Sequence, residues 1–533
     1  MSGAVVPSRG GPGPAAASPR PRAAAEVPAL VVPHRGLLMA TVMAAMIMQM
    51  LDTTIANVAL PHMQAALGAT QDTVTWVLTS YVLASAVMLP MAGWLVDRIG
   101  IKWLLIGSVV LFTVASVLCG LSQNLSQIVI FRVFQGMAGA FLAPLAQTVM
   151  LNTHTAAERP RVMGVFTQGI MLGPIAGPVL GGYLTENFDW RWVFFVNVPI
   201  GIACVFALLA LMPSTPRVKR PFDLFGWLLI ATAVSALQLM LDRGPTKDWF
   251  GSLEIAFYAA LSISTFWMFA VHSITTKHPL FPAAMFADRN LVAGLFYMFL
   301  IGMVMFSVMA LMPVMLQGIY GYPAIDSGWL LTPRGFGMLL SMMVFGRFIP
   351  RIDPRIMLGL GLALTAFSLY LMTGWAPDMP REPIIISGFI QGIGLSFTFV
   401  PLNLIMFATI PPDLRTDGSS LGNLMRNMGS STGIAIATVL LSRNIQINHA
   451  ELGANITRFG LPVDLDRIGA YGEYGEAALR VVDAMVNKQA AMIAYLDDYW
   501  LMSIACVVAI PLLLILKVSK GPPPSAEEMQ PSH

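Results

Sequence analysis

The sequence predicts an all-α membrane protein with two bundles of six helices and two additional membrane helices, about fourteen in total. Of the 533 residues, 56% are hydrophobic and 11% are charged, whereas soluble domains carry roughly 25% charged residues. Apolar runs of about 20 residues, each long enough to cross a bilayer as a helix, recur from Leu37 almost to the C-terminus. A weak repeat, FQGM at 134–137 and IQGI at 390–393, indicates that the two bundles are related.

The chain divides in order into tail, bundle, linker, bundle and tail. Residues 1–36, rich in Pro, Ala and Gly without a cleavage site, are expected to form a disordered tail rather than a signal peptide. Six apolar runs form an N-terminal bundle at 37–212, and a linker at 213–290 contains two more. Six further runs form a C-terminal bundle at 291–517, with a long polar loop at about 444–495, before a tail at 518–533.

Lysine and arginine are concentrated in alternate loops between these runs. The positive-inside rule then places both termini in the cytoplasm and the 444–495 loop on the outer side. Parallel repeats of this kind form a substrate site near the middle of the membrane, between two halves that rock against each other.

Asp52 is the only carboxylate well inside the first run, and Asn57 lies near it on the helix surface. A carboxyl group in a cavity of low dielectric has its charged form disfavoured, so Asp52 is the leading candidate for a proton site. The alternative is that Asp52, near the outer end of the run, only meets interfacial water.

Two arginines also fall inside apolar runs. Arg132, followed by Gln135, lies in the fourth run, and Arg426 lies in the corresponding bundle of the second half. Burying an arginine costs roughly 2.5 to 3.5 kcal/mol on insertion scales, so each should face a cavity or a partner. Snorkelling to the interface or a purely structural ion pair is the alternative.

A tight polar loop follows the second run. It combines turn glycines with an acid and two bases, namely Gly93, Asp97, Arg98, Gly100 and Lys102. Such a loop suits a latch that forms an ion pair in only one conformation, with Asp97 meeting a helix N-terminus or an arginine. An ordinary turn carrying positive-inside charge is the simpler reading.

The fifth run is dense in glycine and contains two prolines. The residues are Gly169, Gly173, Pro174, Gly177, Pro178, Gly181 and Gly182. Four-residue glycine spacing gives a smooth face for close helix approach, while proline frees backbone carbonyls and bends the helix. This run should pack tightly against a neighbour and be able to rearrange.

Together these motifs resemble the fourteen-helix drug:proton antiporters of the major facilitator superfamily, the EmrB/QacA type, over nearly the whole chain. The segments that carry the resemblance are 51–61, 93–102, 128–139, 169–182 and 190–201. The resemblance implies the major facilitator fold and the export of lipophilic or amphiphilic drugs, driven by the proton gradient without a cofactor or metal. It also implies a bacterial inner-membrane location.

By this resemblance, Asp52, Asn57, Arg132, Gln135 and Arg426 would couple protons to substrate. The loop at 93–102 would act as a gate, and the glycines at 169–182 would form the antiporter motif that limits leak. The loop departs from the family pattern at Ile101, where a basic residue is usual, and its second copy has Pro350 opposite Asp97.

The likeness is greatest to the EmrB branch, which implies a periplasmic adaptor of the EmrA type and an outer-membrane channel. Tyr471 and Tyr474 stand among polar residues in the 444–495 segment, which would either dock the adaptor or be a passive loop.

Other functional classes are less well supported by the sequence. No GxxxxGK[ST] loop for an ATP-driven pump and no HExxH metal motif is present, and a net charge of +3 is too small to indicate a nucleic-acid surface. A membrane enzyme is a weaker alternative, because it would need a clustered nucleophile, base or metal site, which the seven histidines do not form. A facilitator, or an exporter of one metabolite or lipid, stays open. The 36 methionines suit an adaptable apolar pocket, although many of them would simply face lipid or neighbouring helices.

Overall fold

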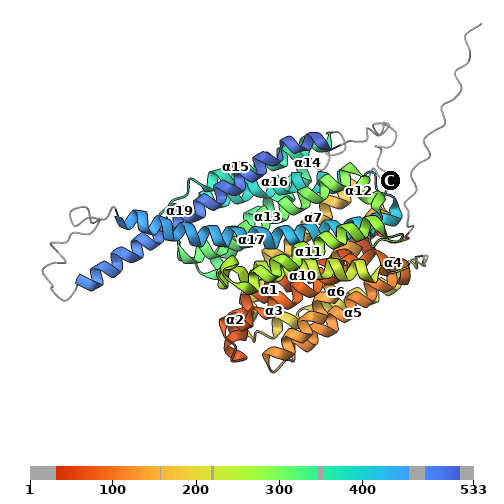
Figure 1. Cartoon of the computed structure of the whole chain (residues 1–533), viewed down its shortest axis with the longest axis horizontal. Coiled ribbons are helices and arrows are strands. Elements are labelled where there is room, and N and C mark those ends of the chain that lie inside the picture. The colour runs from red at the N-terminus through yellow and green to blue at the C-terminus, as the bar shows by residue number, and fades with distance from the viewer. Residues whose placement is uncertain are drawn as a thin grey trace, which may run out of the picture.

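The computed structural model describes residues 32–155, 158–215, 217, 221–345, 352–454 and 475–516, and every regular element in these ranges is a helix. The long helices run side by side in one bundle (Figure 1), which confirms the all-α prediction. The expected tails at 1–36 and 518–533 lie almost wholly outside the described residues.

The N-terminal bundle begins with α1 and ends with α9. Its elements are α1 (Arg35–Ala66), α2 (Gln71–Val74), α3 (Trp76–Met88), η1 (Leu89–Met91), α4 (Ala92–Ile99), α5 (Ile101–Gly120), α6 (Leu125–Thr153), α7 (Arg159–Asn187), α8 (Trp192–Phe195) and α9 (Asn197–Leu211). Asn124 caps α6 by accepting a hydrogen bond of 2.9 Å from the Gln127 backbone amide. Gly100 separates α4 from α5 with a φ of 90°, a conformation that favours glycine.

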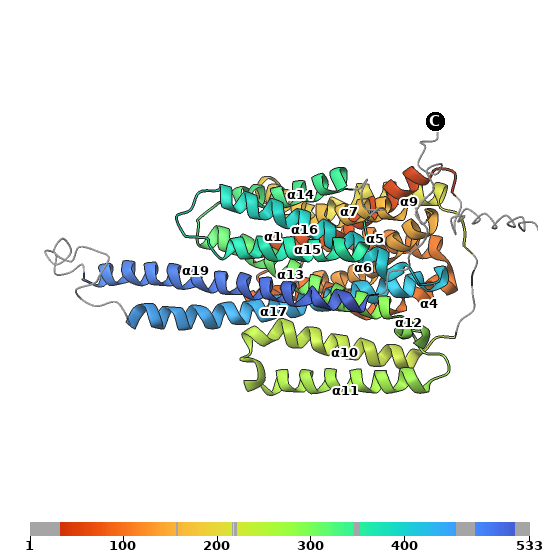
Figure 2. The ribbon, with the colours of Figure 1, turned by 90° about the horizontal axis from the view of Figure 1, so that it is seen from above.

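The linker forms a helical hairpin beside the two bundles (Figure 2). It consists of α10 (Leu224–Arg243), η2 (Gly244–Thr246), η3 (Trp249–Gly251) and α11 (Leu253–Thr275). At one end, the Asp223 carboxylate accepts the Gly226 amide at 2.8 Å and lies 2.9 Å from His272 Nε2. At the other end, Arg243 forms an ion pair with Glu254. These contacts hold α10 and α11 in register.

The C-terminal bundle completes the fold. Its elements are α12 (Ala283–Ala287), α13 (Arg289–Gly318), α14 (Ala324–Phe345), α15 (Pro354–Met372), α16 (Glu382–Phe407), η5 (Pro412–Leu414), α17 (Arg415–Ala454), α19 (Gly475–Ala509) and η6 (Pro511–Ile515). Eleven segments of the described residues are long and apolar enough to cross a membrane. With α7, α14 and α17, which lie within the same bundle, they make fourteen long segments.

The two halves repeat one packing scheme. In the first, α1 packs on α7 and α6 packs on both α3 and α5; in the second, α13 packs on α17 and α16 packs on both α14 and α15. A Cβ added at Gly136 of α6 would lie 2.3 Å from the Tyr81 carbonyl oxygen, and one at Gly392 of α16 would lie 2.0 Å from that of Arg334. The glycines of the sequence repeat therefore perform the same close approach in both halves.

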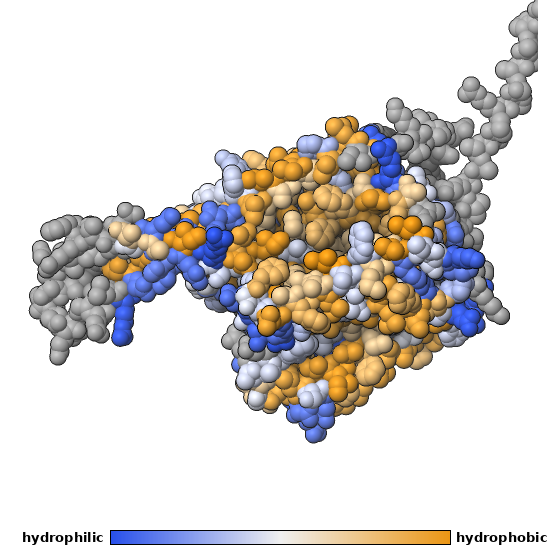
Figure 3. Space-filling view, in the orientation of Figure 1, coloured by the Kyte–Doolittle hydropathy of each residue, from blue (hydrophilic) through white to orange (hydrophobic). Residues whose placement is uncertain are grey.

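The surface agrees with a membrane setting. Figure 3 shows apolar side chains over the middle of the visible face and polar ones towards the two ends of the bundle. Large apolar side chains of α11 are strongly exposed, for example Trp267 at 73% and Ile263 at 72%. Exposed apolar surface of this extent matches a lipid environment.

The segment expected to be a loop at 444–495 is helical at both ends, because α17 continues to Ala454 and α19 begins at Gly475. Both helices project beyond the bundle (Figures 1 and 2). His449 Nε2 lies 3.1 Å from Asp483 Oδ1, and Asn448 donates to the Ala490 carbonyl at 3.5 Å. Polar residues of these extensions pair with the neighbouring helix, so the extensions form no continuous apolar run. For this reason they could not be predicted as helices from hydrophobicity alone. Tyr471 and Tyr474 lie outside the described residues.

Candidate functional site

Asp52 lies in the middle of α1, not near its end. The helix runs from Arg35 to Ala66, so Asp52 stands seventeen residues after its first residue and fourteen before its last. Its side chain is 1% exposed. The alternative of an acid at the interface is therefore wrong, and the carboxylate must be satisfied inside the protein.

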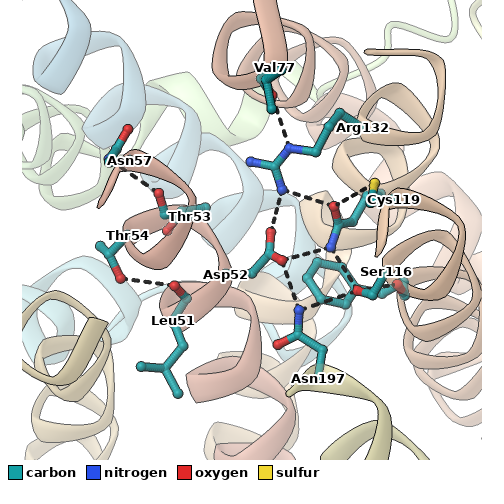
Figure 4. A network of polar contacts seen from close by, with 12 residues as sticks. Leu51, Asp52, Thr53, Thr54, Asn57, Val77, Ser116, Cys119, Arg132 and Asn197 are labelled. Atoms are coloured by element: carbon teal, nitrogen blue, oxygen red, sulfur yellow. Dashed lines mark hydrogen bonds and ion pairs between the residues drawn. The ribbon is translucent and has the colours of Figure 1, made fainter. Parts of the chain in front are cut away.

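Three donors from two other helical segments surround this carboxylate (Figure 4). Arg132 Nη1 donates to Asp52 Oδ2 at 2.6 Å. Gln135 Nε2 and Asn197 Nδ2 each donate to Asp52 Oδ1 at 2.8 Å. These three donors, one of them charged, occupy most of the lone-pair sites of the buried carboxylate.

Arg132 is held as firmly as its partner. Its Nε donates to the Val77 carbonyl at 2.9 Å and its Nη1 to Gln135 Oε1 at 2.9 Å. The guanidinium lies 4.6 Å from the centroid of the Tyr81 ring, a cation–π contact. With 1% exposure, Arg132 does not snorkel; it is one half of a fully buried ion pair. Asp52, Arg132 and Gln135 thus lie together in one network.

Asn197 and Ser116 belong to the same network, although sequence reasoning gave them no role. Gln135 Nε2 donates to Ser116 Oγ at 2.8 Å, and Asn197 Nδ2 lies 3.3 Å from the same oxygen. Ser116 in turn donates to the Phe112 carbonyl at 2.9 Å. One feature of the sequence could have indicated this role. Ser116 and Asn197 are polar residues in two of the most apolar runs, and a polar side chain buried there needs a hydrogen-bond partner.

Two other candidates lie apart from this network. Asn57 is exposed and donates to the Thr53 carbonyl of its own helix at 3.3 Å. Arg426 lies in α17 of the other half, where its Nη2 donates to Asn423 Oδ1 at 2.8 Å. The structure therefore does not bring these two residues to Asp52.

The glycine face of α7 packs against α1, the helix that carries Asp52. An added Cβ would lie 1.8 Å from Met43 Cε at Gly169, 2.4 Å from Met50 Cβ at Gly173, 2.0 Å from Thr54 Oγ1 at Gly177 and 3.2 Å from Val58 Cβ at Gly181. Gly182 points into open space. The side chains of Pro174 and Pro178 are outside the described part of α7, whose helix runs through both positions. Four glycines thus allow one continuous close contact.

The loop at 93–102 meets the other half through a glycine. The Asp417 carboxylate of α17 occupies the space where a Gly93 side chain would be, 1.5 Å from an added Cβ. Lys102 Nζ donates to the Leu209 carbonyl at 3.1 Å, and Arg98 is exposed. Asp97 is half-buried at the end of α4. The second copy of this loop, with Pro350, lies outside the described residues.

Further contacts join the two halves at this end of the molecule. Arg415 Nη1 donates to Asn152 Oδ1 at 2.7 Å and Ser419 Oγ to Gln147 Oε1 at 2.5 Å. Gln147 Nε2 donates to Asn403 Oδ1 at 2.6 Å. The bundle is therefore closed at the end that carries α4 and the start of α17.

The chain resembles known membrane exporters over most of its length. The family model described as Major Facilitator Superfamily matches residues 42–433. The multidrug export protein EmrB of Escherichia coli (strain K12) is 31% identical over 479 residues, which cover 89% of this chain and 94% of that protein. The fatty acid resistance protein FarB of Neisseria gonorrhoeae is 31% identical over 477 residues, with the same two coverages.

A solved structure shares the fold. The major facilitator proton:xylose symporter XylE, bound to 6-bromo-6-deoxy-D-glucose, superposes with a TM-score of 0.59 and covers 90% of this chain and 95% of its own, at 12% sequence identity.

Proposed function

This chain belongs to the major facilitator superfamily and, within it, to the EmrB/QacA-type multidrug exporters, and we propose that it exchanges protons for lipophilic or amphiphilic drugs. It is a multi-pass membrane transporter, not an enzyme. Export of toxic compounds across the bacterial inner membrane, by alternating access of the two bundles to either side, is the activity that its features support best.

The observation that carries the proposal is the buried ion pair of Asp52 and Arg132, at 2.6 Å. In the conformation closed at the α4 end, three donors hold the Asp52 carboxylate. When α1 moves relative to α6 and α9, the donors separate from the carboxylate, whose charged form is then poorly compensated. Binding a proton at Asp52 relieves that cost. The proton is released when the donors return.

The other motifs support the same cycle. The close α1–α7 contact lets the helix that carries Asp52 move together with α7 relative to α6 and α9, and the Gly93–Asp417 contact lies at the closed α4 end. We take this end as cytoplasmic, with both chain termini, from the distribution of lysine and arginine. Each elementary charge that enters through 100 mV supplies about 2.3 kcal/mol for the work.

An adaptor site is part of the proposal. The projecting ends of α17 and α19 lie at the opposite end of the bundle from α4 (Figure 2), which would be periplasmic. A helical projection of this kind offers a surface for an adaptor of the EmrA type, which would lead to an outer-membrane channel.

A second candidate is the export of one metabolite or lipid rather than many drugs. The observation in its favour is the 31% identity to a protein named for fatty acid resistance. A survey of resistance in cells that lack or overproduce the protein distinguishes the two, because a multidrug exporter changes resistance to several unrelated compounds.

Purified protein in liposomes tests the proposal directly. With an imposed pH difference, we expect uphill movement of a substrate drug that stops when a protonophore collapses the gradient. Uphill movement that continues with neither a pH nor a voltage difference would contradict proton coupling.

A further inference from the structure

A second acid lies in a membrane-spanning helix of the C-terminal half. Asp498 belongs to α19, within the apolar segment Arg480–Leu514, which is long enough to cross a membrane. Its side chain is 2% exposed. Ala494, Tyr495 and Met502, which lie one helical turn before or after it, are buried as well. Asp498 therefore stands on the face of α19 that packs inside the bundle.

The surroundings of Asp498 lack the partners that Asp52 has. Asp498 Oδ2 is buried without a hydrogen-bond partner among the described residues, and no cation of those residues forms an ion pair with it. Asp52, in contrast, accepts three hydrogen bonds, one of them from Arg132. Burying an ionised carboxylate without such partners is so costly that the group usually takes up a proton instead.

The residue before Asp498 is also an aspartate. Asp497 is exposed and accepts a hydrogen bond from Asn444 Nδ2 of α17 at 3.4 Å. Two carboxylates at adjacent positions disfavour each other's ionised form. Asp497, with water and an amide donor beside it, is the better place for a negative charge. The same acid thus occurs twice in succession, once exposed and once buried.

Other ionisable groups near Asp498 do not compensate its charge. The helices that pack on α19 are α17, α15 and α13. The ionisable residues of this region are Tyr495, Asp497 and Tyr499 on α19, Arg443 on α17, Tyr370 on α15, Asp378 in the loop after it, Tyr320 on α13 and, beyond these helices, Arg334 on α14. The members on α17, α15 and the loop are exposed. The hydroxyls of Tyr320 and Tyr499 donate to acceptors other than Asp498.

Asp498 lies towards the end of the bundle from which α19 projects. Ser503, five residues later, donates to the Ala366 carbonyl of α15 at 2.8 Å. The Tyr499 ring meets that of Trp375, beyond the end of α15, with 6.1 Å between the centroids. The chain thus runs along α19 from the projection towards the α4 end (Figure 2), and Asp498 precedes both contacts. In the orientation taken above, this is the periplasmic side, from which an exporter driven by the proton gradient takes up its protons.

We propose that Asp498 is a second proton-binding site, which carries a proton in the conformation closed at the α4 end. The proton comes from the periplasmic side, binds to the carboxylate and forms a neutral carboxylic acid. It is released when the C-terminal bundle rearranges and the carboxylate meets donors or water. Building on the proton-coupled export proposed above, each cycle then carries a proton at Asp498 in addition to the one at Asp52.

Infrared spectroscopy tests this site without a gradient or a drug. The full chain is measured at neutral pH in dodecylmaltoside, a detergent without carbonyl groups, because a protonated carboxyl absorbs separately from an ionised one. We expect a carboxylic-acid band in the wild type that disappears in Asp498→Asn. Asp497→Asn is the matched control and should keep the band, since the burial of Asp498 is unchanged.

Two spectroscopic results overturn the proposal. One is a wild-type spectrum without a carboxylic-acid band, a result that needs no variant to fold. The other is a band that Asp498→Asn retains in full.

Drug accumulation in liposomes tests whether the cycle uses this proton. With the voltage clamped at zero and a pH difference of about one unit, each exchanged proton supports at most about a tenfold drug gradient. Asp498→Asn cannot bind the proton and should therefore lower the steady-state accumulation about tenfold, whereas Asp497→Asn should leave it unchanged. Accumulation by Asp498→Asn at the wild-type level overturns the proposal.

The two proposals fail separately. A carboxylic-acid band that depends on Asp498, in a protein that shows no proton-driven accumulation, contradicts the proposed function alone. Proton-driven accumulation by a wild type without a carboxylic-acid band contradicts the Asp498 site alone.

Discussion

The Asp52–Arg132 ion pair is fully buried. Both side chains are 1% exposed, and every polar neighbour of the carboxylate is a donor. Removing one member leaves a buried charge, whereas removing both leaves a network of neutral amides. Their contributions to stability should therefore be strongly coupled.

Arg132→Met should lower the free energy of unfolding by about 3 to 5 kcal/mol, because the Asp52 carboxylate loses its counter-charge in a buried site. Adding Asp52→Asn should restore much of the loss. Arg381→Met breaks the exposed pair with Asp326, at 3.7 Å, and should cost at most about 1 kcal/mol. Denaturation of the purified protein measures all three variants. If Arg132→Met and Arg381→Met lowered the free energy of unfolding equally, the buried pair would contribute no more to stability than an exposed one.

Much of this site could be predicted from the sequence, because charges are rare inside apolar runs. Asp52 and Arg132 stand out for that reason, and Gln135 lies one helical turn from Arg132. The partnership itself could not be predicted, since 80 residues separate the two and only the packing of α1 on α6 joins them. Asn197 and Ser116 were missed because neutral polar residues are common in membrane helices, and their role depends on which face of the helix they occupy.

At the scale of elements, the contact of α7 with α1 places a glycine face against the helix that carries Asp52. The glycine spacing predicted this smooth face, and the structure supplies its partner. Where an added Cβ would meet backbone atoms, a methyl group forces the helices apart; where it meets nothing, the same change is harmless.

Gly173→Ala should destabilise the protein by about 1 to 3 kcal/mol, because its Cβ would lie 2.8 Å from the Met50 carbonyl carbon. Transport should slow with it, since α1 is displaced. Gly182→Ala, on the same helix, meets nothing within 4 Å and should be neutral or slightly stabilising. Thermal unfolding and drug uptake into liposomes measure both. Identical behaviour of the two variants would contradict the role of the glycine face.

At the scale of the whole molecule, the hydrophobic pattern was sufficient to predict the fourteen long segments and the repeat, because the bilayer demands long apolar helices. The hydrophobic pattern could not predict that α17 and α19 extend beyond the bundle, because their polar residues pair with each other there and form no apolar run. Nor could it show that Asp417 of one half lies against Gly93 of the other, since that contact depends on how the halves are closed.

Gly93→Ala should open the α4 end, because its Cβ would lie 1.5 Å from Asp417 Oδ1. Spin labels at positions 154 and 413, on a background with the three cysteines replaced, report the separation of the halves there. We expect a longer distance in Gly93→Ala and a return to the wild-type distance when Asp417→Ala is added. Gly107→Ala, which meets nothing within 4 Å, is the control. An unchanged distance in Gly93→Ala would show that this contact does not hold the end closed.

Transport by Asp52→Asn in liposomes tests proton coupling through Asp52 most directly. Downhill exchange of labelled for unlabelled drug is measured beside uphill uptake driven by a pH difference. We expect exchange to continue, because the two halves still alternate, and driven uptake to fall to the level seen with a protonophore. Driven uptake at the wild-type rate would contradict the account.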